Sequence, residues 1–172
     1  MKSSQKVAFL SLLFFSGWIL DFLVKRWAQA RLAGGPPIEL VPGFFELRYA
    51  ENVAVAFSFL HSLPPGWRKA VIYLFNGLAI VGLLFLLYYW RGKGLSRLIP
   101  PVLILSGALG NLYDRLAYGY VVDLFHFHYR EAWSFPIFNP ADVLICCGVG
   151  FFLLFCRGEY QEEVRNDGHD ES

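Results

Sequence analysis

The sequence predicts an all-α membrane protein with four transmembrane helices and a small extracytoplasmic β-cradle between the first and the second helix. Of its 172 residues, 56% are hydrophobic and only 17% are charged, whereas a soluble domain usually carries about a quarter charged residues. A helix needs about 20 residues to cross the hydrocarbon core of a bilayer. The apolar residues gather in four segments, at 7–24, 70–90, 98–116 and 141–156, of which the last is short for a span.

The first segment has features of both a signal peptide and a membrane span. Lys2 and Lys6 precede the apolar run, as in a signal peptide. The run is long, however, and Asp21 and Lys25 interrupt the approach to the candidate cleavage site, Ala28-Gln29-Ala30. We therefore expect an uncleaved first helix. Because residues four apart share a helix face, Asp21 and Lys25 can pair there, as an interfacial anchor or as support for a nearby site.

The loop at about residues 27–68 is expected to contain β-structure. Between Pro36 and Tyr49, apolar and polar residues alternate between proline and glycine residues, a pattern typical of short paired strands. We expect a small β-hairpin or cradle that lies on the outer leaflet of the membrane.

The third segment combines two prolines, small residues and a polar cluster. Pro100 and Pro101 are tolerable in the first turn of a helix, where their missing amides have no intrahelical partner. The small residues that follow allow close helix contacts in a membrane: Ser106, Gly107, Ala108 and Gly110. Asn111 and Asp114 share a helix face, and Arg115 could neutralise Asp114 or another carboxylate. These three side chains predict a polar network that locks the helix.

Four spans place both termini on one side of the membrane. The turn at 91–97 carries Arg91, Lys93 and Arg97, and basic residues in short loops mark the cytoplasmic side. We assign residues 1–158 to a single domain and residues 159–172 to a polar, disordered cytoplasmic tail.

Asp123 and Asp142 bracket one short loop beside apolar segments. A charged side chain at bilayer depth costs about 2.5–3.5 kcal/mol on insertion scales, so intramembrane acids are candidates for function. Neither acid has a basic neighbour in sequence, and two desolvated carboxyls close together can share a proton, as in aspartic proteases. Taken alone, Asp142 is better explained as an N-cap or first-turn acid of the last helix.

Other chemistries have weaker support. His126 and His128 share one face of an extended segment near Asp123, but no HExxH helix or Cys/His pairing accompanies them. We therefore predict no metal and no other cofactor. The chain lacks the GxSxG motif of serine hydrolases. A formal net charge of +1 without a basic cluster predicts no nucleic-acid partner.

Five short motifs, taken in order, resemble the lipoprotein signal peptidase (signal peptidase II) family. They are Asp-x-x-x-Lys at 21–25, Asn-x-x-x-Ala-Phe at 52–57, Gly-Ala-Leu-Gly-Asn-Leu-Tyr-Asp-Arg at 107–115, Val-Val-Asp at 121–123 and Phe-Asn-x-Ala-Asp at 138–142. The resemblance implies an aspartic endopeptidase of the bacterial inner membrane. Such enzymes use water to cut the signal peptide from prolipoproteins just before a diacylglyceryl-modified cysteine.

The resemblance also implies a role for each matching residue. Asp123 and Asp142 match the catalytic dyad, and Asp114 matches a further acid of the family. The polar residues that hold substrate backbone or orient the dyad are matched by Asn52, Asn111, Arg115 and Asn139. We expect a monomer with its active site near the outer leaflet, in contact with membrane lipid.

One departure leaves a second hypothesis open. The family usually has glycine two residues after the loop asparagine, where this chain has Ala54, which puts the loop geometry and substrate fit in question. The alternative is a non-catalytic four-span protein, either a pseudoenzyme that binds signal peptides or a transporter-like scaffold. A transporter would more naturally show two related halves, and no internal repeat is evident.

Overall fold

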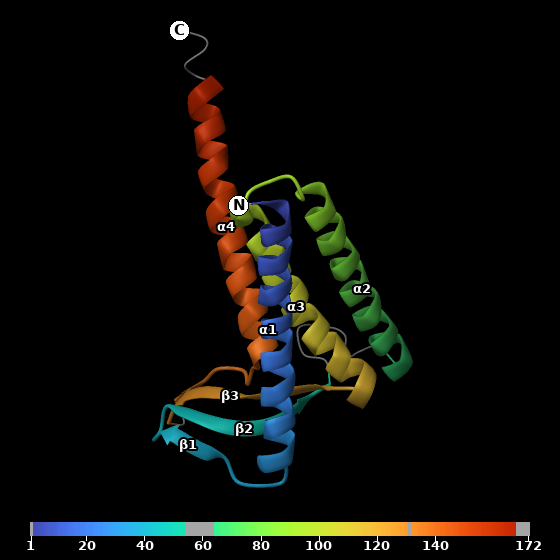
Figure 1. Ribbon diagram of the computed structural model, residues 1–172. Coiled ribbons are helices and arrows are strands. Elements are labelled where there is room, and N and C mark those ends of the chain that lie inside the picture. The colour runs from blue at the N-terminus through green and yellow to red at the C-terminus, as the bar shows by residue number, and fades with distance from the viewer. Residues whose placement is uncertain (1, 54–63, 131, 168–172) are drawn as a thin grey trace.

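The computed structural model describes residues 2–53, 64–130 and 132–167, and consists mostly of helices with a small antiparallel sheet at one end (Figure 1). The helices are α1 (Ser3–Arg31), α2 (Pro65–Tyr89), α3 (Leu95–Tyr118) and α4 (Pro140–Asp167). The strands are β1 (Ile38–Val41), β2 (Phe45–Asn52), β3 (Val121–Tyr129) and β4 (Trp133–Ser134). The start of α1 and the end of α4 both lie away from the sheet (Figure 1).

Within the described residues, three helices are long and apolar enough to cross a membrane: α1, α2 from Lys69 onward, and α3. They coincide with the first three predicted segments. The apolar part of α4, Pro140–Leu154, is shorter, so the span count of four stays a prediction.

The helices bury small and polar residues and expose apolar ones. The buried positions of α1 are Gly17, Asp21, Lys25 and Ala28, whose spacing places them along one face. The apolar stretch of α2 buries none of its residues. Large exposed apolar surfaces on a folded protein mark contact with a membrane or a partner, and here they surround the helical part of the molecule.

Helices α3 and α4 approach each other closely at glycines. A Cβ atom on Gly107 would overlap the backbone oxygen of Ala141, and one on Gly148 would lie 2.8 Å from the backbone oxygen of Pro100. The predicted role of small residues in α3 is therefore confirmed at Gly107. This contact fixes the start of α4 against the middle of α3.

The position expected for the two prolines was wrong. Helix α3 begins at Leu95, so Pro100 and Pro101 lie in its second turn, where both are buried. The apolar run begins only at Leu98, and the polar first turn of the helix therefore gives no hydrophobic signal. Each proline lacks an amide, so the helix forgoes two internal hydrogen bonds here.

The sheet combines two loops of the chain. Its order is β1-β2-β3-β4 with antiparallel pairing. The predicted hairpin is present as β1 and β2, but placing the β-structure only between the first two helices was incomplete. Strands β3 and β4 come from the connection between α3 and α4, and such long-range pairing leaves no local signal. This pairing places Asn52 opposite Val121, beside Asp123.

The expected disordered tail also needs correction. Helix α4 continues to Asp167, so the first part of segment 159–172 is helical. The segment contains four glutamates, one glutamine and one arginine, residue types with high helix propensity, whereas its polarity alone suggested disorder.

Gly107→Ala tests the contact between α3 and α4. Because the added methyl group would overlap the Ala141 carbonyl, we expect the free energy of unfolding to fall by about 1–3 kcal/mol. The measurement is thermal or SDS-induced unfolding in detergent.

Gly82→Ala in α2 is the matched control, because no described atom lies within 4 Å of a Cβ added there. Alanine has the higher helix propensity, so stability should be unchanged or higher by up to about 1 kcal/mol. Equal losses from both substitutions would contradict close packing at Gly107.

Candidate active site

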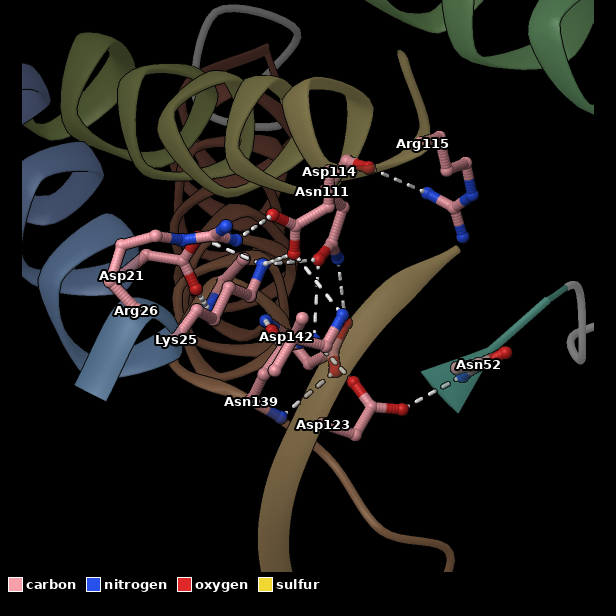
Figure 2. A network of polar contacts seen from close by, with 12 residues as sticks. Asp21, Lys25, Arg26, Asn52, Asn111, Asp114, Arg115, Asp123, Asn139 and Asp142 are labelled. Atoms are coloured by element: carbon pink, nitrogen blue, oxygen red, sulfur yellow. Dashed lines mark hydrogen bonds and ion pairs between the residues drawn. The ribbon is translucent and has the colours of Figure 1, made fainter. Parts of the chain in front are cut away.

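Polar side chains from five elements meet where the helices join the sheet (Figure 2). Helix α1 contributes Asp21, Lys25 and Arg26; β2 contributes Asn52; α3 contributes Asn111, Asp114 and Arg115; and β3 contributes Asp123. The last two, Asn139 and Asp142, lie at the start of α4. All nine residues that the sequence singled out for the site thus belong to this region.

Asn139 and Asp142 form a reciprocal cap at the start of α4. The backbone amide of Asp142 donates to Oδ1 of Asn139 at 2.9 Å, and the amide of Asn139 donates to Oδ2 of Asp142 at 3.1 Å. Pro140 occupies the first helical position, which suits a residue without an amide. The arrangement is a capping box with aspartate as its acid. Asp142 is thus a first-turn acid, and its Oδ1 still faces Asn111.

Asn139 also connects the two candidate catalytic acids. Its side-chain Nδ2 donates to Oδ1 of Asp123 at 2.6 Å, while its backbone amide serves Asp142. Asn52 donates to the other oxygen of Asp123 at 2.9 Å. Asp123 is only 2% exposed. The structure therefore brings Asp123 and Asp142 to the same asparagine.

Asn111 links this pair to α1. Its Oδ1 accepts from Lys25 at 2.9 Å and from Asn139 at 3.2 Å, and its Nδ2 donates to Oδ1 of Asp142 at 2.9 Å. One side chain of α3 therefore contacts residues from both α1 and α4.

Lys25 lies at the centre of a buried ionic network. It is 1% exposed and pairs with Asp21 at 2.9 Å and with Asp114 at 3.1 Å. The second oxygen of Asp21 accepts the amide of Ala141 at 2.8 Å. The predicted Asp21–Lys25 pair is therefore present, and it supports the start of α4.

The partners of Asp114 differ from those considered in sequence. Asp114 pairs with Lys25 and with Arg26, the latter at 2.9 Å, and it accepts the amide of Val122 at 3.2 Å. Arg115 instead donates to the backbone oxygen of Asn111 at 3.3 Å. Consecutive residues of a helix point in different directions, which separates Arg115 from Asp114.

Arg26 is the residue of this network that the sequence interpretation missed. Its guanidinium lies 4.3 Å from the centre of the Tyr118 ring while it pairs with Asp114. A second basic residue directly after Lys25 was the available signal. Ala54 and Phe57, which belong to the quoted motifs, lie outside the described residues.

The protonation of Asp123 is set by its surroundings. Burial raises its pKa to about 6, although hydrogen bonds from Asn52 and Asn139 act to lower it; the nearby Asp142 raises it further. A carboxyl with such a pKa can hold or release a proton near neutral pH.

Besides Nε of Arg26, two buried polar atoms at this site have no hydrogen-bond partner among the described residues. They are the side-chain oxygen Oδ1 of Asn52, an acceptor, and Nε of Arg115, a donor. Buried polar groups in folded proteins are rarely left unpaired. Together they can serve the N–H and C=O groups of a bound peptide.

An apolar depression of about 310 Å³ opens beside the first turn of α4. It is lined by Leu20, Val24, Phe125, Pro140, Val143 and Leu144. Phe125 and Val143 are close in sequence to Asp123 and Asp142, so apolar surface adjoins the acids.

Lys25→Met tests the ionic network. The substitution would leave the carboxylates of Asp21 and Asp114 buried without their shared cation, and breaking a buried pair in this way costs about 3–5 kcal/mol. We expect a loss of that size in the free energy of unfolding, measured in detergent.

Lys69→Met is the control, since Lys69 is exposed on α2, and its effect should stay within about 0.5 kcal/mol. Adding Asp21→Asn to Lys25→Met should restore part of the stability. Similar small effects at both lysines would show that the network contributes little.

Comparisons with a family model and with curated proteins both point to signal peptidase II. Residues 13–157 match the family model for signal peptidase (SPase) II. The lipoprotein signal peptidases of Yersinia pestis (strain Pestoides F) and Yersinia pseudotuberculosis (serotype O:3, strain YPIII) are each 40% identical to the chain over 154 residues. The match covers 87% of this chain and 88% of each relative.

Two solved structures of bacterial membrane enzymes, determined by the in meso method at 1.9 and 2.3 Å resolution, have the same fold. Each superposes with a TM-score of 0.71, at 22% and 21% sequence identity. The matches cover 87% and 91% of this chain, and 93% and 92% of the solved chains. The family model and the curated relatives together establish that the chain belongs to the signal peptidase II family of peptidases.

Proposed function

We propose that this protein is an aspartic endopeptidase that removes signal peptides from diacylglyceryl-modified prolipoproteins, cutting just before the lipidated cysteine. Asp123 and Asp142 are its two catalytic acids. The substrate class is supported by relatives named lipoprotein signal peptidase. The main support for this mechanism is that both carboxyl groups accept hydrogen bonds from Asn139, which holds them close together, and that Asp123 is buried.

The two acids divide the chemistry between them. One carboxylate takes a proton from a water molecule, which attacks the scissile carbonyl, while the protonated partner hydrogen-bonds the carbonyl oxygen. The raised pKa of Asp123 supports a shared proton near neutral pH. This route needs no metal, no cofactor and no covalent intermediate.

Asn52 and Arg115 hold the substrate backbone beside the acids. Their unpaired atoms offer one acceptor and one donor, which match the two polar groups of a peptide unit. Arg115 also interacts electrostatically with both Asp142 and Asp123, so its cation can stabilise negative charge that develops on the scissile carbonyl.

The remaining polar residues position the acids. Asn111 orients Asp142 through a direct hydrogen bond. Asp21 fixes the first turn of α4, and Lys25 and Asp114 complete the ionic network behind it. None of these four residues needs to contact substrate, so their substitution should act mainly through stability and geometry.

The protein spans the bacterial inner membrane four times as a monomer, with α4 as the fourth span and both termini in the cytoplasm. Lys6 supports this arrangement, because its ammonium donates to the backbone oxygen of Arg91 at 2.9 Å and so ties the start of α1 to the basic turn after α2. The acids then lie near the outer leaflet. The apolar depression beside α4 suits membrane lipid or the apolar part of a membrane-embedded substrate.

Asp123→Asn and Asp142→Asn test the dyad. Each should lower the cleavage rate of a diacylglyceryl-modified prolipoprotein by at least about 10²-fold, because proton transfer is lost. The free energy of unfolding should fall by only about 1–3 kcal/mol, because asparagine keeps the shape of aspartate but loses one of the two hydrogen bonds that each carboxylate accepts. The assay uses purified protein in detergent.

Glu39→Gln, which neutralises an exposed acid on β1, should retain the parental rate. Cleavage at the parental rate by either aspartate variant would exclude that residue from catalysis. Substrate binding without cleavage by the parent protein would instead support the non-catalytic alternative.

Asn52→Ala tests the link between Asp123 and the pH dependence of cleavage. The hydrogen bond from Asn52 lowers the pKa of Asp123, so its removal should raise that pKa. In the profile of kcat/KM against pH, the ionisation near 6 should move to higher pH. Asn76→Ala in α2, which removes a bond to the backbone oxygen of Ile72, should leave the profile unchanged. A downward or absent shift in Asn52→Ala would contradict the assignment of this ionisation to Asp123.

A further inference from the structure

A second cluster of polar residues lies on the sheet, apart from the acids. We propose that Glu46, His126 and His128 bind one divalent transition-metal ion, with zinc as the expected metal. The proposal is independent of the peptidase activity, because none of the three residues takes part in the proposed chemistry.

The strand register brings the three residues together. Glu46 on β2 lies directly opposite His126 on β3, and His128 follows two positions later on the same strand. Alternate residues of a strand share one face, so both imidazoles lie on the face opposite Asp123. The rings stack with their centres 5.1 Å apart.

The possible ligand atoms are close enough for one ion. One atom from each residue lies within 4.8 Å of the others. Nδ1 of His126 is 2.7 Å from one Glu46 oxygen, and Nε2 of His128 is 3.9 Å from the other. Zinc binds nitrogen and carboxylate oxygen at about 2.0–2.2 Å, which places tetrahedral ligands roughly 3.3 Å apart. The longest separation in the set exceeds this value by up to about 1.5 Å, so the side chains close around the ion, and a water molecule supplies the fourth ligand.

Burial of the cluster favours a bound cation. Glu46 is 4% exposed and His126 is 8% exposed. Nε2 of His128 is a buried atom without a hydrogen-bond partner among the described residues. A buried, unpaired ring nitrogen beside a buried carboxylate is a ready metal ligand, and a mixed imidazole and carboxylate set suits zinc better than magnesium or calcium.

His126 already has the outer partner that metal-binding histidines usually have. Its Nε2 lies 2.8 Å from the hydroxyl oxygen of Ser134 on β4. When Nδ1 binds the metal, Nε2 carries the proton and donates it to Ser134. Such a bond fixes the tautomer and the direction of the ring.

Arg48 is the competing cation. Its Nε donates to Oε1 of Glu46 at 2.7 Å, and its side chain is 48% exposed. An incoming ion therefore meets a carboxylate whose charge is partly neutralised, and Arg48 can turn toward solvent when the ion binds. Removing this charge should strengthen metal binding, because the two cations repel each other.

The metal would join β2 to β3, the two strands that carry Asn52 and Asp123. Bound metal stabilises the folded state because the unfolded chain has no preformed site. The expected role is thus a structural clamp on the sheet.

The test uses the full chain in detergent, without a polyhistidine tag. Isothermal titration with Zn²⁺ should show one ion per chain, and Co²⁺ should give the visible absorption of a tetrahedral site. The temperature of unfolding should rise with the Zn²⁺ concentration. In His128→Ala the affinity should fall by about 100-fold or more, and in Arg48→Gln it should rise.

His169→Ala is the matched control, since it removes one imidazole from the C-terminal residues, and its zinc affinity should equal that of the parent. Unfolding without metal shows whether His128→Ala remains folded, and Arg48→Gln tests the site without removing a ligand. The proposal fails if the parent binds no stoichiometric Zn²⁺, if His128→Ala binds as the parent does, or if binding is lost in His169→Ala.

Discussion

The buried ammonium of Lys25 is the interaction on which the geometry of the site depends. It contacts Asp21, Asp114 and Asn111, and it is almost fully removed from solvent. An unpaired charge in such a place is costly, so the ion requires its partners from both α1 and α3. With Arg26 added, two cations face two carboxylates and the network is neutral. Because Asp21 also holds the amide of Ala141, this charge balance fixes the start of α4.

The same ammonium sets the direction of the neighbouring amides. Lys25 can only donate hydrogen bonds, so the side-chain oxygen of Asn111 must face it, which leaves the NH₂ group for Asp142. Asn139 is oriented in a similar way, because its oxygen caps the amide of Asp142 and its NH₂ group turns to Asp123. The donor that Asp142 receives from Asn111 is therefore oriented by Lys25, and the donor that Asp123 receives from Asn139 is oriented by the start of α4. This explains why residues that need not touch substrate accompany the acids in the sequence motifs.

The features that could be predicted from the sequence are those that depend on residues close together in the chain. The pairing of Asp21 with Lys25, the small residues of α3 and the hairpin after α1 follow from periodicity and turn residues. Asp142 was considered either as a first-turn acid of the last helix or as a member of the polar site. The structure shows that these two positions are compatible, because Asp142 lies in the first turn of α4 and also accepts a hydrogen bond from Asn111. The predictions that failed concern contacts between residues far apart in sequence. Nothing near Glu46 in the sequence indicates that it pairs with a strand containing His126, eighty residues further along the chain. The sequence therefore placed only Asp123 near the histidines, and Asp123 lies on the opposite face of β3.

The sheet constrains how deep the acids can lie. An open sheet cannot rest in hydrocarbon, because the edge strands β1 and β4 would leave backbone groups unpaired. Helices α1, α2 and α4, by contrast, expose many large apolar side chains and suit hydrocarbon. Asp123 belongs to β3, and Asp142 to the first turn of α4, so both acids lie at the boundary between these two surfaces. A peptide bond that reaches them must emerge from the membrane at that level. This requirement agrees with the proposed cleavage at the end of a substrate's apolar helix, and it disfavours cleavage in the middle of the bilayer.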